Sequence, residues 1–340
     1  MGGESERILT EFEIHCYIAL FLVCGILSYA YRSFKTKNPF PDIDFLSKEE
    51  RVFLDVKTGQ ELEFPSLDDE PSVNLSVIVP AYNEQDRLKP MLDETIEFLN
   101  ERRKKIPTFK YEIIVVSDGS TDKTMQVVHQ YTDKCGEDIV RGLKLLKNRG
   151  KGGAVTLGTK CARGSIILFA DADGATKFAD LEKLEDKLKE LTDGDYIEDK
   201  NNAAGCNGVI VGSRAHLEAL ANVQRSFFRN ILMKGFHFIV WFTGVRTIRD
   251  TQCGFKLFTR KSALQLFSSI HVQRWAFDVE LLFIAEVLHI PMAEVSVNWT
   301  EIEGSKIVPV FSWIQMGWDV LNIWLHYTLG LWKIKAMENK

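Results

Sequence analysis

Short apolar runs alternate with amphipathic patterns through the middle of the chain. Four runs predict buried strands: 75–80 (LSVIVP), 111–118 (YEIIVVSD), 165–171 (SIILFAD) and 208–213 (GVIVGS). Between them, helical spacing of apolar positions predicts helices at 85–104, 121–134, 152–162 and 178–191. Apolar strands separated by helices form parallel sheets that are covered on both faces. The pattern therefore predicts an α/β fold with a mainly parallel sheet flanked by helices.

The N-terminal part contains an uncharged apolar run at 14–31 (IHCYIALFLVCGILSYAY). At about 1.5 Å per residue, a helix of this length spans roughly 27 Å, close to the thickness of a bilayer core. Acidic residues precede the run, while Arg32, Lys35 and Lys37 follow it, and no small-residue cleavage site is evident. This order favours an uncleaved transmembrane anchor over a signal peptide. The positive-inside bias places 1–13 in the lumen and the rest of the chain in the cytoplasm.

The remaining boundaries follow from changes in composition. Residues 32–74 are polar, irregular and Pro-bearing, which predicts a juxtamembrane linker, with a hairpin allowed around Thr58-Gly59. The strand and helix pattern then predicts one catalytic domain over 75–306. Within it, the polar stretch 193–207 is interpreted as a loop that carries no chemistry.

Two further segments are apolar enough to suggest contact with lipid. Within 307–340, a thin polar stripe recurs every three or four residues of an otherwise apolar, Trp-rich stretch, which predicts an amphipathic helix. Because Trp prefers the headgroup boundary, we expect this helix to lie in the membrane interface, the alternative being a core helix. The segment 231–245, within the region 226–247, is too short to span and is interpreted in the same way. The stripe consists of Ser312, Gln315, Asp319, Asn322, His326, Gly330 and Lys333.

Polar clusters follow the predicted strands, where ligands bind in sheets of this type. After the first strand, Pro80 and Tyr82 are suited to pack on a nucleobase or ribose, and Glu84 to accept ribose hydroxyls. The alternative is that Asn83 and Asp86 simply cap the next helix. These residues alone leave both interpretations open.

Two carboxylate clusters follow the next strands. Asp118 can accept an N–H group of uracil or guanine, which indicates a nucleotide without naming the base. Asp171 and Asp173, two residues apart on an extended chain, project to the same side and repel unless a cation lies near them. Oxygen ligands beside a phosphate favour Mg²⁺ or Mn²⁺, the alternative being that Asp173 caps the next helix.

Cationic residues supply the complementary charge. Lys151 lies in the glycine-rich turn 148–154 that opens a predicted helix, where amides and a Lys favour phosphate oxygens. The turn lacks the spacing of a P-loop, so a purely structural turn is the alternative. Arg214, Arg229 (or Arg225) and Lys306 precede or follow the predicted membrane-contacting segments, as expected for binding an anionic lipid headgroup.

Composition excludes several classes of protein. With 45% hydrophobic and 26% charged residues, the chain is neither disordered nor fibrous, and its six cysteines form no CxxC pair. A net charge of −5 provides no general affinity for nucleic acid.

The motifs VPAYNE, VVSDGSTDKT, NRGKGGA, DADGATKF, GSR and DTQCGFKLF occur in this order between 75 and 310. Together they resemble the inverting family 2 glycosyltransferases, which have the nucleotide-sugar-binding GT-A fold. The resemblance implies glucose transfer from UDP-glucose to dolichyl phosphate with Mg²⁺ or Mn²⁺, at the endoplasmic reticulum membrane on its cytosolic side. The glycine after DAD favours glucose over mannose. GDP-mannose as donor, a nucleotidyltransferase and a non-catalytic nucleotide-binding scaffold are the alternatives.

The resemblance also implies roles for individual residues. Asp173 matches the metal ligand, and Asp250, Gln252 and Asp278 match residues near the donor sugar. The implied donor contacts are Pro80, Tyr82, Glu84, Asp118, Lys151, Asp171, Ala172, Asp173 and Gln252. The implied acceptor-phosphate contacts are Arg214, Arg229 and Lys306. The implied catalytic residues are Asp173, Arg214, Asp250 and Asp278.

Overall fold

The computed structural model describes residues 43–217, 240–302 and 311–335, together with Tyr17, Gly25, Ser28 and Gly235. The expected anchor at 14–31, apart from three single residues, lies outside the described residues. Arg229 and Lys306, expected at the acceptor phosphate, also lie outside them. Among the described residues, no helix combines the length and the apolar character needed to cross a bilayer.

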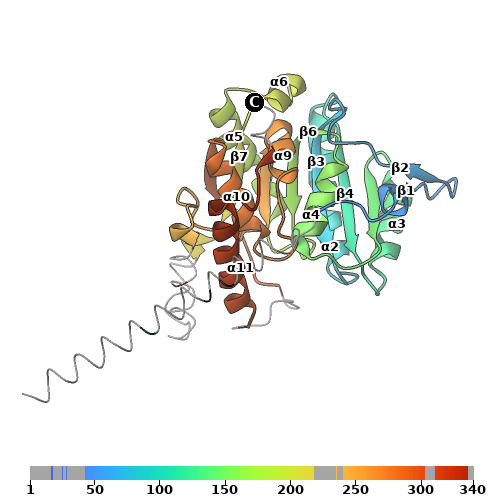
Figure 1. Cartoon of the computed structure of the whole chain (residues 1–340). Coiled ribbons are helices and arrows are strands. Elements are labelled where there is room, and N and C mark those ends of the chain that lie inside the picture. The colour runs from blue at the N-terminus through green and yellow to red at the C-terminus, as the bar shows by residue number, and fades with distance from the viewer. Residues whose placement is uncertain are drawn as a thin grey trace, which may run out of the picture.

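A seven-stranded sheet in the order β5-β4-β3-β6-β8-β7-β9 forms the centre of the domain (Figure 1). β8 pairs antiparallel with β6 and β7, and the other neighbouring strands pair in parallel. The predicted mainly parallel α/β fold is therefore confirmed. The strands are β3 (Val73–Ala81), β4 (Tyr111–Asp118), β5 (Val140–Leu145), β6 (Gly164–Ala170), β7 (Val209–Ser213), β8 (Phe255–Thr259) and β9 (Met292–Ser296).

The four predicted helices are present with ends shifted by a few residues. The 178–191 helix is divided into a short 3₁₀ segment, η2 (Phe178–Asp180), and α5 (Leu181–Thr192). The expected loop 193–207 contains a short helix, α6 (Lys200–Gly205), whose N-cap Asp199 accepts two backbone amides. The first three predicted helices correspond to α2 (Leu88–Lys105), α3 (Thr124–Cys135) and α4 (Lys151–Lys160). The described residues also form α9 (Arg260–Phe267), α10 (Phe277–Val287) and α11 (Phe311–Thr328).

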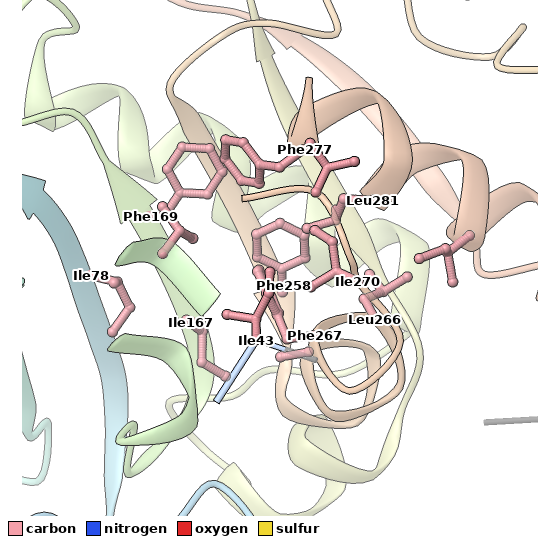
Figure 2. Close-up of a cluster of buried hydrophobic side chains, with 14 of the residues drawn as sticks. Ile43, Ile78, Ile167, Phe169, Phe258, Leu266, Phe267, Ile270, Phe277 and Leu281 are labelled. Atoms are coloured by element: carbon pink, nitrogen blue, oxygen red, sulfur yellow. The ribbon is translucent and has the colours of Figure 1, made fainter. Parts of the chain in front are cut away.

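The central strands β3, β4 and β6 are buried on both faces, and alternate residues of each strand point to opposite sides of the sheet. In β3, Val77 and Val79 enter the core under α2, α3 and α5, whereas Ile78 enters the core under α4, α9 and α10. Figure 2 shows the second of these cores, with Ile78 and Ile167 from the sheet near Phe169 and Phe258. The sheet is thus a rigid base for the loops at the carboxyl ends of its strands.

From residue 43 onward, the expected linker packs on the domain. It contains a 3₁₀ turn, η1 (Lys48–Arg51), and the strands β1 (Val52–Leu54) and β2 (Glu61–Glu63). The two strands pair antiparallel around Gly59, whose φ is +70°, so the hairpin that the pattern allowed is confirmed. Its apolar residues lack periodicity and gave no signal, yet four of them are buried in the core. These are Ile43, Phe53, Phe64 and Leu67.

The C-terminal helix α11 is present, and the polar stripe is only partly buried: Asn322 and His326 are buried, whereas Gln315 and Lys333 are exposed. The apolar residues Val320 and Ile323 are buried beside them, while Trp318 is 56% exposed. His326 is accommodated because its ring stacks on Trp332, with ring centroids 4.5 Å apart. One side of α11 therefore packs on the domain and the opposite side exposes apolar residues.

Candidate active site

Two loops at the ends of β3 and β4 are held together by their own side chains. Asn83, in the left-handed region with φ of 52°, accepts a hydrogen bond from the Thr121 amide at 2.8 Å. The Glu84 amide donates to Thr124 Oγ1 at 2.8 Å. Asn83 thus joins the two loops and does not cap α2, which begins at Leu88. Tyr82 is 40% exposed at the end of β3, where an aromatic ring is available to a ligand.

Glu84, expected at the ribose, is engaged by Arg87. The Arg87 guanidinium donates to both carboxylate oxygens, at 2.8 and 2.7 Å. Arg87 Nη1 also lies 3.9 Å from Asp173 Oδ2. Burial opposes the charge on Arg87, but Glu84 and Asp173 outweigh it and raise the pKa of its guanidinium. Arg87 therefore links the loop after β3 to the Asp171–Asp173 pair.

Asp118, at the end of β4, organises the turn before α4. Its two oxygens accept the backbone amides of Arg149 and Gly150, at 2.7 and 2.8 Å. Burial raises the pKa of the Asp118 carboxyl to about 6, and the two amide bonds and the Arg149 charge offset this only in part. The Asp118 carboxylate, which is the expected contact to the base, therefore also holds the glycine-rich turn 148–154 that is expected at the phosphates.

This pKa predicts that donor binding depends on pH. As the pH falls through about 6, Asp118 takes up a proton and one oxygen becomes a poorer acceptor for its amide. At pH 5, about one molecule in ten keeps the ionised form, so the Kd for UDP-glucose, the donor that the sequence resemblance implies, should rise about tenfold between pH 7 and pH 5. Calorimetric titration with UDP-glucose is the measurement, because its diphosphate has no group titrating near pH 6. Asp118→Asn should bind weakly with a flat profile; a flat wild-type profile would contradict the assignment.

The two carboxylates after β6 differ in their surroundings. Asp171 Oδ1 lies 2.6 Å from the Lys151 ammonium, whereas Asp173 Oδ1 accepts the Ala175 amide at 3.0 Å. Ala172 between them is buried in the core under α2. Burial and then the neighbouring Asp171 charge raise the pKa of Asp173. A carboxylate whose ionised form is opposed by a neighbouring negative charge is stabilised when a cation binds beside it.

The donor set fits a divalent cation shared with a substrate. The side chains of Asp171 and Asp173 are 37% and 28% exposed, so both reach the surface of the site. Among the described residues, no three His, Cys, Asp or Glu side chains form a complete metal cage. Mg²⁺ and Mn²⁺ bound beside phosphates need only one or two protein carboxylates, since phosphate oxygens and water complete the shell. Asp173 would be the protein ligand, because Lys151 already neutralises Asp171.

A second ion pair, between Lys256 and Asp278, is buried close to this site. Lys256, fully buried in β8, donates to Asp278 Oδ1 at 2.6 Å and to the Cys253 carbonyl at 2.6 Å. Both lysine ammonium groups lie over the Phe169 ring, Lys151 at 5.5 Å and Lys256 at 5.1 Å from its centre. Asp278, expected near the donor sugar, is therefore paired and 2% exposed. Burial raises the pKa of Asp278, opposed by Lys256 and Lys151.

Gly254 allows the backbone to approach Asp171 closely. The Asp171 amide donates to the Gly254 carbonyl at 3.1 Å. A Cβ at position 254 would lie 1.9 Å from Asp171 Oδ2, so no other residue fits without moving that carboxylate. The glycine in DTQCGF thus helps to set the position of the Asp171 carboxylate.

Arg214 and Asp250, expected at the acceptor and at the donor sugar, pair with each other. Arg214 Nε and Nη2 donate to the two Asp250 oxygens, each at 2.8 Å. The guanidinium also lies over the Trp299 ring, 5.4 Å from its centre. Burial would raise the pKa of Asp250, but the Arg214 hydrogen bonds and charge lower it. Asp250 is thus ionised and fixes the orientation of Arg214.

Several residues of the site carried no interpretable sequence signal. Arg87 and Trp299 were not singled out from the sequence, and neither was Lys256, although a lysine inside the apolar run FKLF is unusual for a buried strand. Gln252, which was expected here, has a buried Nε2 with no hydrogen-bond partner among the described residues. Such a donor is costly unless a ligand or water accepts it.

The chain as a whole is similar to proteins of known family and structure. The profile of the family described as Glycosyl transferase family 2 matches residues 76–267. A dolichyl-phosphate beta-glucosyltransferase of Drosophila melanogaster is 53% identical over 95% of this chain and 96% of its own. The protein of the same name from Homo sapiens is 55% identical over 85% of this chain and 86% of its own. A solved structure of glucosyl-3-phosphoglycerate synthase from Mycobacterium tuberculosis, with Mn²⁺, UDP and phosphoglyceric acid, aligns with a TM-score of 0.47 and 16% identity over 75% of this chain and 78% of that one.

Proposed function

The chain belongs to glycosyl transferase family 2, and we propose that it transfers glucose from UDP-glucose to dolichyl phosphate with inversion at the anomeric carbon. The observation that carries the proposal is the cluster of Asp171, Asp173 and Lys151 beside the Asp118 turn. It joins a nucleobase acceptor, a cation-binding carboxylate and a phosphate-side ammonium in one site. The relatives that share about half of its residues carry the name of this activity.

The donor would bind along the loops after β3, β4 and β6. Asp118 would accept the uracil N–H, with Pro80 and Tyr82 beside the base. Lys151 and a divalent cation held by Asp173 would bind the diphosphate, and the buried Gln252 amide would donate to the sugar. When bound, the cation would supply positive charge to the leaving diphosphate.

The reaction needs no general base. The acceptor phosphate, with a second pKa of about 6, is largely dianionic at neutral pH and is already a nucleophile. One of its oxygens forms a bond to the glucose anomeric carbon while the bond from that carbon to the β-phosphate oxygen breaks. The bonding electron pair leaves with UDP. The side chains therefore position two anions and screen their repulsion.

We propose that the acceptor phosphate binds at Arg214, whose guanidinium is oriented by Asp250 and whose side chain is 28% exposed. Arg214→Ala should lower acceptor kcat/KM tenfold to a hundredfold, because one charge-assisted hydrogen bond is worth about 1.5–3 kcal/mol. The Kd for UDP-glucose should stay within a few-fold. Steady-state kinetics with a short dolichyl phosphate and calorimetry with UDP-glucose measure the two effects.

Arg214→Lys is the companion variant, since it keeps a charge beside Asp250 and loses only the bidentate geometry. It should lie between the wild type and Arg214→Ala in acceptor kinetics. A collapse of donor binding with normal acceptor kinetics would instead assign Arg214 to the nucleotide.

We further propose that the protein acts at the endoplasmic reticulum membrane, held by 14–31, with the domain on the cytosolic side. The charges flanking that run support the orientation. An exposed apolar patch supports contact with lipid: Trp241, Phe242, Trp318 and Leu329 are 52%, 50%, 56% and 48% exposed. Phe242 also packs on Trp324, with ring centroids 5.5 Å apart, so the patch joins the two segments expected at the interface.

A donor screen tests the proposed reaction. The purified protein in detergent receives a short dolichyl phosphate with either UDP-glucose or GDP-mannose, and the released nucleotide and the lipid product are quantified. Glucosyl lipid with stoichiometric UDP is the expected result. Mannosyl lipid would move the assignment to GDP-mannose, pyrophosphate would indicate nucleotidyl transfer, and no product with either donor would favour a scaffold.

A further inference from the structure

A strap of chain before the hairpin, residues 43–50, lies against α4 and the turn that precedes it. Near its start, the Lys160 ammonium donates to the Ile43 carbonyl at 2.7 Å, and Lys160 is the last residue of α4. Near its end, Glu50 pairs with Arg149, two residues before α4 begins. The strap is therefore fixed at both ends of the helix whose first turn is the proposed phosphate-side turn.

Glu50 is a completely buried carboxylate with three donors. Its Oε2 accepts the Leu46 amide at 2.7 Å and Arg149 Nη2 at 2.8 Å, and its Oε1 accepts the Leu146 amide at 2.9 Å. Two of these donors, Leu146 and Arg149, belong to residues 146–150, which lead into α4 and include the start of the glycine-rich turn 148–154. A buried carboxylate of this kind holds its donors in one geometry, because leaving any of them unpaired is costly.

The same turn provides the amides that bind Asp118. Arg149 donates through its side chain to Glu50 and through its backbone to Asp118 Oδ1, at 2.7 Å in the second case. Asn148 Nδ2 adds a bond to the Asp118 carbonyl at 3.1 Å. Lys151, which contacts Asp171, follows directly. The turn thus has one side bonded to the strap and the other bonded to the nucleotide site.

The other end of the strap is held by packing. Ile43 is 3% exposed and belongs to the core cluster that contains Ile167, Phe258 and Phe267 (Figure 2). The strap therefore cannot leave the turn without exposing an apolar side chain and breaking a buried ion pair.

We propose that Glu50 is a positioning residue for donor binding: through Arg149 and Leu146 it fixes the turn that presents Asp118 and Lys151 to the nucleotide diphosphate. The strap then makes donor affinity depend on a segment that precedes the catalytic fold. This inference rests on the proposed function, since it assumes that UDP-glucose binds at this turn.

Glu50→Gln is the direct test, because the side chain keeps its size but loses the charge and places an amide N–H₂ among three donors. The Kd and KM for UDP-glucose should rise about tenfold, while the KM for dolichyl phosphate stays within twofold. Lys160→Met, which loosens the other end of the strap without burying a charge, should raise the UDP-glucose Kd two- to threefold. It also keeps the inference testable where Glu50→Gln fails to fold.

Glu112→Gln is the matched control. Glu112 is equally buried and accepts Ser76 Oγ and the Arg163 amide and Nε, but it lies at the start of β4, about 20 Å from Asp118 at its end. It should lower the Tm as Glu50→Gln does and leave the UDP-glucose Kd unchanged. Equal changes of Kd in both variants, or an unchanged Kd in Glu50→Gln, would overturn the inference.

Amide hydrogen exchange separates this inference from the proposed function. The amides of 146–150 should exchange at least tenfold faster in Glu50→Gln than in the wild type, with or without a ligand. If they do but the wild type does not bind UDP-glucose, the positioning role stands and the proposed donor is wrong. If the exchange rates are equal, the strap does not hold the turn.

Discussion

Replacing Asp173 by Asn is expected to lower kcat for glucosyl transfer about 10²–10³-fold while the protein stays folded. The variant removes one negative oxygen from the proposed cation site, and loss of one group that stabilises developing charge costs a factor of this size. The fold should persist because the Asn oxygen can still accept the Ala175 amide, as the Asp173 carboxylate does. Activity at saturating Mg²⁺ or Mn²⁺ and the Tm are the measurements.

The control for this variant is Asp138→Asn, at a side chain that is 90% exposed and pairs only with Arg163 among the ion pairs of the described residues. It should leave kcat within twofold. If Asp173→Asn keeps more than half of the activity at saturating metal, Asp173 is not the cation ligand, and Asp171 becomes the remaining carboxylate after β6.

The strands that were predicted each contain at least three consecutive apolar residues. β4 was predicted at 111–118 and is observed at Tyr111–Asp118, because its run IIVV places apolar residues on both faces of the strand. β5, β8 and β9 were missed because a charged residue, Arg141, Lys256 or Glu294, interrupts a short apolar pattern in each; Arg141 and Lys256 are at most 3% exposed. Arg141 pairs with Glu112 and Lys256 with Asp278, residues distant in sequence. A pattern along the chain contains no information about such partners.

The orientation of α11 illustrates a second limit. Periodicity correctly separated a polar stripe from an apolar arc, but it did not reveal which side meets the domain. The apolar residues Val320 and Ile323 meet the domain, and Asn322 and His326 of the stripe are buried beside them, where Trp332 covers the His326 ring. Gln315 and Lys333 of the same stripe are exposed, so the stripe follows the border of the packed side.

For the site, residue types at strand ends were sufficient to find the carboxylates but not their partners. Asp118, Asp171 and Asp173 lie where the strand pattern placed them. The groups that set their charge and position, such as Arg87 and Glu50, come from elsewhere in the chain. Only the three-dimensional arrangement shows that Arg214 and Asp250, assigned to different substrates, form one pair. A pattern along the chain gave no indication that each is the ion-pair partner of the other.

The second large effect is expected at Gly254. In Gly254→Ala the new Cβ would lie 1.9 Å from Asp171 Oδ2 and 2.3 Å from its Cγ, so the carboxylate must move away from Lys151. We expect kcat/KM for UDP-glucose to fall about a hundredfold, since the cation site and the phosphate-side ammonium are both disturbed. Overpacking should also cost about 1–3 kcal/mol of stability, measured by urea unfolding. Gly205→Ala, where nothing lies within 4 Å of the added Cβ, should change neither quantity by more than a small factor.

A double-mutant cycle identifies the cause of that loss. If Gly254→Ala acts by displacing the Asp171 carboxylate, it should cost about a hundredfold in the wild type but less than threefold in an Asp171→Ala background, where the methyl group has space. Strong coupling between two residues in contact is the signature of a shared mechanism. Equal losses in both backgrounds would show that Gly254 acts through the backbone of the loop before β8 and not through Asp171. In that case the close approach at Gly254 would be a feature of folding rather than of the donor site.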